Sequence, residues 1–417
     1  MNQYIDIKDT LLAITEKYPE TIQIFAENGF PQMNDQAKRE EFGNALSLEM
    51  ALTLKQLNKD SFVNMLEEAI AQSRANEDAA LNEEETSKTK ADLTISGLLP
   101  CPVRMPLNES LDRFIAEYQQ SSGLKIDYDL KAASMGLDWL KEDLQKSDDP
   151  QKLDDLFISA GFDLFFDENL MRRFKEKDVF KDLSGLEKLN KDFDNETIDL
   201  KDPKGHYSMI ATVPAVFLVN QKELGDREAP KSWADLLKPE FENSVSLPIG
   251  DFDLFNAILL TLYRNYGEGA VLRLGRTLLR SMHPSEMVRS NVKKMQRPAV
   301  TIMPYFFTKT VKEGSPMQAV WPEDGAIISP IFMLTKASQA DKLKPVADFF
   351  LSQEVGEILS HNGRFPSVSP KVDNQLNPDQ QFMWLGWDFI YQNDIAKLIT
   401  HCEELYHNSI NLNPVES

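Results

Sequence analysis

The chain contains 417 residues, 42% of them hydrophobic, which is enough for two or three domains with packed cores and excludes a disordered protein. Its 66 acidic and 45 basic residues give a formal net charge of -21, which argues against binding to nucleic acid or to an anionic membrane surface. With two cysteines, Cys101 and Cys402, a disulfide framework is excluded, although the pair could form a single bridge.

The first twenty residues bear on where the protein resides. MNQYIDIKDTLLAITEKYPE alternates charged and apolar side chains, without the basic head, apolar stretch and small-residue cleavage site of a secretory signal. No later window approaches the roughly 18 apolar residues that span a bilayer. We therefore expect a cytoplasmic protein without direct membrane insertion.

Residues 1–74 are expected to form a small helical domain. Apolar side chains recur three or four residues apart in LLAITEKY, ETIQIFAENGF, LSLEMALTLKQL and SFVNMLEEAIAQ. Gly29 follows its helix as a C-cap would, and Asp60 and Ser61 precede theirs as N-cap candidates. The polar stretch 75–91 has no apolar periodicity, and we interpret it as an acidic linker.

From residue 92 the pattern becomes α/β. ADLTISG, LKIDYDL and DDLFISAGFDLFF are expected strands, and the amphipathic segments MPLNESLDRFIAEYQQSSG and LDWLKEDLQKS are expected helices between them. This alternation predicts βαβ units and a mostly parallel sheet. Ligands of such sheets bind outside the carboxyl ends of the strands, where we expect the loops SGLLPCP (residues 96–102) and SAGFD (residues 159–163).

Two long extended segments are expected to cross between two lobes. HYSMIATVPAVFLVNQK, interrupted by Pro214, is too long for one compact strand, and MQAVWPEDGAIISPIFMLTK returns later in the chain. Residues of about 92–210 and 326–417 would form the first lobe, and residues of about 214–320 the second. A ligand cleft between the lobes is the geometric consequence.

The order of these segments resembles a known family over residues 92–413. The resemblance is carried by PKSWADLLKPEF (230–241), WPEDGAIISP (321–330), ADFFLSQE (347–354) and PSVSP (366–370). It is to the type 2 periplasmic-binding-protein fold, and in particular to extracellular solute-binding proteins of ferric-iron and polyamine ABC importers. The resemblance implies a two-lobed, non-enzymatic protein that binds a small solute or ion.

The N-terminal domain resembles another family. YPETIQIFAENGF followed by LSLEMALTLKQLN is similar to a small helical domain of unknown function found in bacterial redox and iron-centre-repair proteins. Those relatives often carry cysteine just after the turn, whereas this chain has PQMNDQ. An interaction or dimerisation role, with a protein partner bound through residues 1–74, fits this difference better than metal chemistry.

Iron binding is a minority hypothesis on the same resemblance. Ferric-binding relatives use two adjacent tyrosines, but here Tyr305 is followed by Phe306, which has no donor atom. We expect the Tyr305 hydroxyl to face the cleft while Phe306 and Phe307 pack beneath it. No HxxxH or CxxC pattern is present, so we expect no cofactor, with Fe(III) bound through Tyr305 as the exception.

Enzyme chemistry is not expected, because the chain has no Walker loop, GxGxxG or Ser-His-Asp order. Cys101, between two prolines and near a helix start, is either a small buried hydrophobe or a thiol of lowered pKa in the ligand site. Glu323 and Asp324 could select a cationic ligand or form a solvated turn before Gly325.

The predicted ligand site combines donors from both lobes. The predicted ligand-binding residues are Ser96, Gly97, Cys101, Ser159, Ala160, Gly161, Gly250, Asp251, Tyr305 and Glu323. We interpret the chain as a cytoplasmic solute receptor with an N-terminal interaction domain. The alternatives are the substrate-binding component of an ABC importer and an iron or metallocentre-handling protein.

Overall fold

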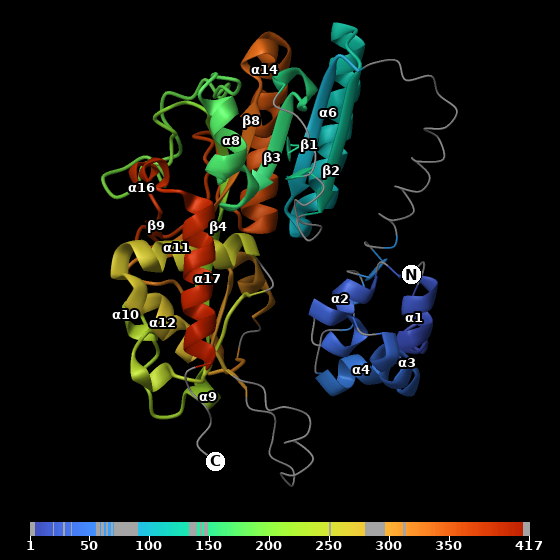
Figure 1. Cartoon of the computed structure of the whole chain (residues 1–417), viewed down its shortest axis with the longest axis vertical. Helices are drawn as coiled ribbons and strands as arrows, with labels where there is room; N and C mark the ends of the chain where they lie inside the picture. Colours follow the sequence, from blue (N-terminus) through green and yellow to red (C-terminus); the bar gives the residue numbers. More distant parts are fainter. Residues whose placement is uncertain are drawn as a thin grey trace. The chain divides into compact units, whose positions relative to one another are not determined.

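The computed structural model describes residues 5–19, 21–27, 30–34, 36–55, 59, 62–63, 66–67, 70, 91–132, 140–141, 144–145, 149–249, 252–279, 297–311 and 314–411. The chain divides into two compact units, Met1–Lys90 and Ala91–Ser417. Figure 1 shows the elements of both units, and each unit is described by itself.

The first unit is helical. Its described elements are α1 (Leu11–Lys17), α2 (Thr21–Glu27), the 3-10 turn η1 (Pro31–Asn34), α3 (Gln36–Ala45) and α4 (Leu48–Lys55). The side chain of Thr10 caps α1 by accepting a hydrogen bond from the Ala13 amide at 3.1 Å. Phe25, Phe30 and Phe62 form an aromatic centre with ring centroids 5.4–6.2 Å apart. The predicted caps Gly29, Asp60 and Ser61 lie outside the described residues.

The described residues of the second unit form a mixed sheet. Its strands are β1 (Leu93–Leu99), β2 (Ile126–Ala132), β3 (Leu156–Ala160), β4 (Tyr207–Asn220), β5 (Val245–Ser246), β6 (Val300–Pro304), β7 (Met317–Val320), β8 (Ala326–Thr335) and β9 (Phe382–Met383). The order is β2-β1-β3-β8-β4-β6-β5, with β7 also paired to β4 and β9 to β8. The expectation of a mostly parallel sheet is wrong, because β8 runs antiparallel to both β3 and β4.

Strand β4 belongs to both lobes, as the sequence predicted. Its first part, Tyr207–Pro214, pairs with β8, and its second part, Ala215–Asn220, pairs with β6 and β7. Pro214 lies where β4 changes its pairing partner from β8 to β6. Because proline has no N–H, it removes one hydrogen bond from the sheet, and this loss is smallest at such a change. The return crossing follows β7, which pairs with the second part of β4, and leads into β8, which pairs with the first.

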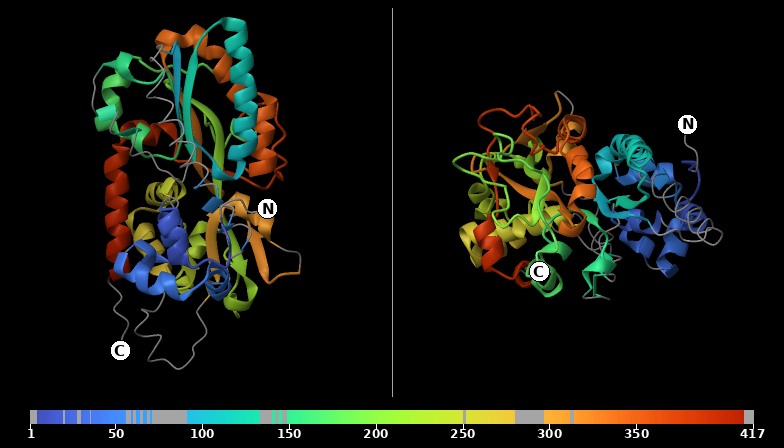
Figure 2. Two further views of the ribbon diagram at one scale, coloured as in Figure 1. Left: turned by 90° about the vertical axis from the view of Figure 1, so that its right-hand side faces the viewer. Right: turned by 90° about the horizontal axis from the view of Figure 1, so that it is seen from above.

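Helices cover both lobes (Figure 1, Figure 2). They are α6 (Arg104–Ser122), α8 (Glu168–Lys175), α9 (Gln221–Leu224), α10 (Trp233–Leu236), α11 (Phe252–Tyr266), α12 (Glu268–Thr277), α14 (Ala340–Phe350), α15 (Gln353–Glu357), α16 (Trp387–Gln392) and α17 (Ile395–Asn411). In α6 the apolar side chains Leu107, Leu111 and Ile115, spaced by four, are buried in the core. The last helix, α17, was expected with the first lobe but packs on α11 and α12 of the second (red beside yellow in Figure 2).

Candidate functional site

Two contacts between the lobes lie beside the crossing strands. The first, which we name the Gly161 contact, brings the end of β3 against α11. The second, the Arg364 contact, brings the 3-10 helix η7 (Tyr305–Thr310) against the segment 361–365. That segment belongs to the first lobe, because Val368, just beyond it, donates its N–H to the carbonyl of Ile210 in β4.

The Gly161 contact depends on glycine. Gly161 has a φ of +80°, and its N–H donates to the Pro330 carbonyl at 3.0 Å. A Cβ at this position would lie 2.7 Å from Oδ1 of Asp253 and 3.1 Å from its Cα. The two lobes can therefore approach this closely only where one of them carries no side chain.

A buried carboxyl group lies beside this glycine. Asn256 of α11 donates its Nδ2–H to Oδ1 of Asp163 at 2.8 Å, which joins the lobes. Burial raises the pKa of Asp163, although this hydrogen bond and the charge of Lys141 act in the opposite direction. Within the described part of the chain, the buried Oδ1 of Asn256 has no hydrogen-bond partner. Asp163 and Asn256 thus present two acceptor oxygens at the lobe junction.

The Arg364 contact is built around Tyr305. Its ring is half-buried and lies edge-on to Trp321, with centroids 5.2 Å apart. The guanidinium of Arg364 lies over the same ring, 4.9 Å from its centroid, and donates from Nη1 to Oγ1 of Thr308. Lys309 donates from Nζ to the backbone carbonyls of residues 361 and 362, both at 2.7 Å.

At the Arg364 contact the positive charges of Arg364 and Lys309 repel each other. Lys309 is exposed, but partial desolvation and the neighbouring charge of Arg364 lower its pKa. Arg364 also has a φ of +50°, a left-handed conformation that is uncommon for a residue other than glycine. It follows the π-helix η9 (Ile358–Asn362), a rare element that is frequent at functional sites.

The prediction that Phe306 and Phe307 pack beneath Tyr305 is only partly correct. Phe306 is half-buried and stacks on Phe365, with centroids 6.3 Å apart. Phe307, however, is 46% exposed, so the prediction that it packs beneath Tyr305 is wrong. Of the three aromatic rings, that of Tyr305 lies against the Arg364 guanidinium.

Ser96 and Gly97 are not in a loop, which corrects their predicted placement. Both lie inside β1, where Gly97 pairs with Ile158 of β3 and a Cβ on it would lie 2.0 Å from the Ile158 carbonyl oxygen. The hydroxyl of Ser96 donates to Oδ2 of Asp154 at 2.6 Å. Gly97 therefore marks a close approach of two strands, and the Ser96 hydroxyl is already bonded.

The other first-lobe residues lie nearer the junction. Ser159 and Ala160 end β3 and pair with β8, and the Ser159 side chain is buried. Cys101 begins the 3-10 turn η2 (Cys101–Val103) just before α6, as predicted, and this turn lies against η9. The Cys101 side chain lies outside the described part of the structure. Cys402 is buried and free, so the single bridge does not form.

The second-lobe candidates have mixed outcomes. Gly250 and Asp251 lie outside the described residues. Glu323 is exposed in a turn, and its N–H donates to the Lys231 carbonyl at 2.7 Å. Asp324 accepts from the amide of Trp233 at 3.0 Å and from the hydroxyl of Tyr266 at 3.0 Å. The Asp324 carboxylate therefore serves the second lobe's own structure.

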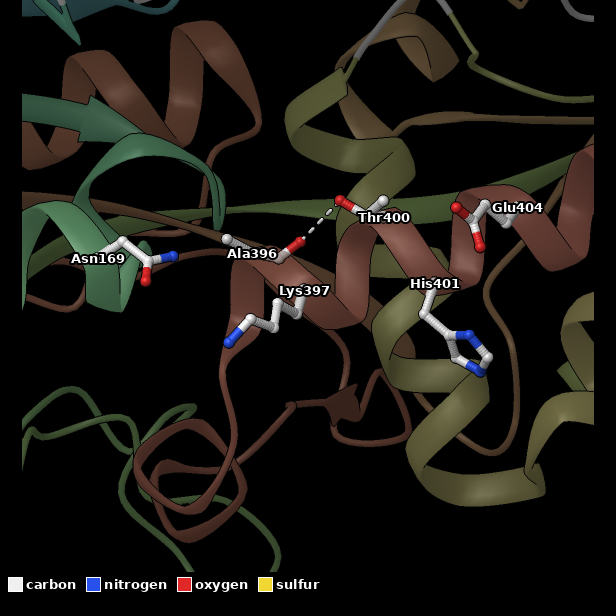
Figure 3. Close-up of a pocket in the computed structure, with 6 residues that line it drawn as sticks. All are labelled: Asn169, Ala396, Lys397, Thr400, His401 and Glu404. Atoms are coloured by element: carbon white, nitrogen blue, oxygen red, sulfur yellow. Dashed lines mark hydrogen bonds between the residues drawn. The ribbon is translucent and has the colours of Figure 1, made fainter.

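A shallow depression of about 330 Å³ lies elsewhere in the second unit, and Figure 3 shows the side chains that line it. It is lined by Asn169, Ala396, Lys397, Thr400, His401 and Glu404. His401 contacts Glu268 at 3.0 Å, and none of the predicted ligand residues lies here. Among the described residues no group of three or more His, Cys, Asp and Glu side chains is placed to hold a metal ion.

Four residues that make polar contacts between the lobes were not predicted as site residues: Lys309, Arg364, Asp163 and Asn256. Asp163 stood in a loop that was singled out, but its role was not assigned. One feature of the sequence could have drawn attention to Arg364. It follows Asn-Gly in HNGRFP, a dipeptide that favours turns with unusual backbone angles.

Comparisons with known proteins agree with this architecture. A family model described as bacterial extracellular solute-binding protein matches residues 151–393, and one described as domain of unknown function (DUF1858) matches residues 5–63. The spermidine/putrescine-binding periplasmic protein of Salmonella typhimurium is 24% identical over 246 residues, which cover 53% of this chain and 66% of the relative.

Solved structures are similar in fold. The structure of an ABC transporter from Clostridium perfringens matches with a TM-score of 0.51 at 17% identity, over 77% of this chain and 100% of that chain. Apo ferric ion-binding protein A of Pasteurella haemolytica has a TM-score of 0.49 at 12% identity, over 78% of this chain and 99% of that one. The two-lobed solute-binding fold and the N-terminal helical family are thus confirmed.

The predicted cytoplasmic location is wrong. The matching family consists of extracellular proteins, and the Salmonella relative is periplasmic. The solute-binding family also confirms that the protein is not an enzyme. Within the described ranges, none of the helices combines the length and the apolar character that crossing a bilayer requires.

Proposed function

This chain belongs to the bacterial extracellular solute-binding protein family, and we propose that it captures a small solute between its lobes as the substrate-binding component of an ABC importer. The observation that carries the proposal is the division of β4 between two lobes whose polar contacts lie beside the crossing. Such contacts break and reform at little cost, so the lobes can open and close around a ligand.

The polar groups at the Gly161 contact favour a cationic solute. At the Gly161 contact, the oxygens of Asp163 and Asn256 could accept hydrogen bonds from an ammonium group, and the Salmonella relative is named for binding spermidine and putrescine. A polyamine is therefore one candidate ligand. Fe(III) is disfavoured, because Tyr305 supplies one phenol oxygen and the positive charge of Arg364 lies over its ring.

A ligand screen tests the proposal. Purified protein would be heated with spermidine, putrescine, amino acids, oxyanions and Fe(III), and a ligand at 100 times its Kd should raise the free energy of unfolding by about 2.7 kcal/mol. Small-angle scattering of the same samples should show a smaller radius of gyration with the ligand that stabilises. A screen in which every solute leaves both quantities unchanged would refute solute capture.

Cell fractionation tests the importer role. We expect the protein in the envelope fraction of native cells. Recovery solely with cytosolic markers would contradict a role beside a membrane transporter, whatever the ligand screen shows.

The N-terminal unit remains a proposed site for a protein partner. Met50 and Leu54, four residues apart on α4, are 58% and 64% exposed, which is unusual for apolar side chains of this size. If this face mediates association, Leu54→Glu should lower the molar mass measured by light scattering. An unchanged mass would exclude self-association through α4.

A further inference from the structure

We propose that Arg364 and Lys309 bind the oxyanion group of the solute, a carboxylate, phosphate or sulfonate, at the Arg364 contact. The inference rests on the proposed solute-binding function and specifies the class of ligand. It is carried by two neighbouring cations, one from each lobe, that share no carboxylate partner in the described part of the chain.

Arg364 has donor capacity to spare. A guanidinium offers five N–H donors, and the described residues engage the one group that bonds Thr308. The guanidinium carbon lies 4.9 Å from the centroid of the Tyr305 ring, and the remaining N–H groups of a guanidinium point outward in its plane, along its edge. That planar edge suits the two oxygens of a carboxylate or phosphate.

Lys309 is held in place by neutral groups. Its ammonium donates to two backbone carbonyls at the end of the π-helix η9, which leaves one of its three donors for a ligand. Partial desolvation and the positive charge of Arg364 lower the pKa of Lys309, and no carboxylate contributes to this shift. An anion would reverse this effect by placing a negative charge beside two positive ones.

The net charge of the protein strengthens the inference. With 66 acidic against 45 basic side chains, the sequence has more than enough carboxylates to pair with every cationic side chain. Elsewhere Lys336 is paired with Asp155 at 3.1 Å even though both are buried. The Arg364 contact instead keeps two adjacent positive charges, backed by a tyrosine whose hydroxyl has no bond to a described residue.

The anion would also connect binding to closure. Lys309 follows β6 in the second lobe, whereas Arg364 belongs to the first, so a ligand bonded to both holds the lobes together. Without an anion, closure brings the two like charges close to each other. The same two residues would thus recognise the solute and make closure depend on it.

The test compares four variants of the full chain by titration calorimetry with citrate, inorganic phosphate and methanesulfonate, and with spermidine and putrescine. Arg364→Asn removes the charge while keeping a residue that tolerates positive φ. Lys309→Met keeps the apolar stem, and Lys222→Met on exposed α9 is the control for lost charge. Thr308→Val breaks the arginine's hydrogen bond across the lobes but leaves both cations.

We expect at least one oxyanion to bind the unaltered protein. Its Kd should rise by about ten- to a hundredfold in Arg364→Asn and Lys309→Met, since hydrogen bonds to charged groups contribute on that scale. Lys222→Met should bind as the unaltered protein does, and Thr308→Val should remain within a few-fold of it.

Other outcomes overturn the inference and can be told apart. If Thr308→Val loses as much affinity as Arg364→Asn, the arginine acts as a latch between the lobes rather than as a ligand. If polyamines bind and Arg364→Asn binds them more tightly, the solute is cationic and the proposed function survives. If only a solute of another kind in the ligand screen binds, the inference alone fails, and if no solute binds, both the inference and the proposed function fail.

Discussion

Replacing Gly161 by alanine tests the lobe arrangement most directly. A Cβ on Gly161 would lie 2.7 Å from Oδ1 of Asp253, and the φ of +80° is itself unfavourable for alanine. The left-handed backbone costs about 1–2 kcal/mol, and overpacking a tight contact costs about 1–3 kcal/mol more. We expect Gly161→Ala to lower the free energy of unfolding by about 2–5 kcal/mol, unless the lobes separate to relieve the clash.

Gly123→Ala is the matched control for this substitution. Gly123 ends α6 with a φ of +73°, and a Cβ on it would have no neighbouring atom within 4 Å, so it bears the backbone cost alone. All five tryptophans lie in residues 91–417, so their fluorescence during urea denaturation follows that unit. Scattering reports any separation of the lobes. Equal losses for both variants with unchanged scattering would show that β3 and α11 do not meet.

Three further predictions concern the same unit. Gly97→Ala should prevent stable folding, because its Cβ would lie 2.0 Å from a carbonyl oxygen of the adjacent strand; a soluble variant with native melting behaviour would contradict this packing. Lys336→Met should cost about 3–5 kcal/mol by leaving buried Asp155 unpaired, whereas Lys344→Met, from an exposed pair, should cost under about 1 kcal/mol; urea denaturation measures both. Burial raises the pKa of Cys402 to about 12, so mass spectrometry should find this thiol unalkylated by iodoacetamide at pH 8, and rapid native labelling would refute its burial.

Local periodicity was enough to predict the main elements. The helix expected in MPLNESLDRFIAEYQQSSG is α6, because its apolar residues recur with the helical period and Gly123 ends it with a positive φ. The long extended run around Pro214 is β4, and its length alone indicated a segment shared by two lobes. These features depend on residues near one another in the chain.

Long-range packing could not be predicted in the same way. The pattern of α17 shows an apolar face, but not that α12 would cover it. Gly97 was assigned to the loop after the first expected strand, whereas here it lies inside β1 and lets two strands approach. Lys309 and the carbonyls it bonds are separated by 52 and 53 residues, so no local motif connects them.

The contacts between the lobes also limit how the protein can respond to a solute. Asn256–Asp163, Lys309 with its two carbonyls, and Arg364–Thr308 are hydrogen bonds, each worth about 0.5–3 kcal/mol net. Shifting a two-state equilibrium from 1:99 to 99:1 takes about 5.5 kcal/mol of differential affinity. An anion seated between the two cations would supply a large part of that difference, because it turns a repulsion present on closure into an attraction. A resident carboxylate in its place would hold the lobes closed without solute, which is a physical reason why, among the described residues of a chain with 66 acidic side chains, none pairs with these two cations.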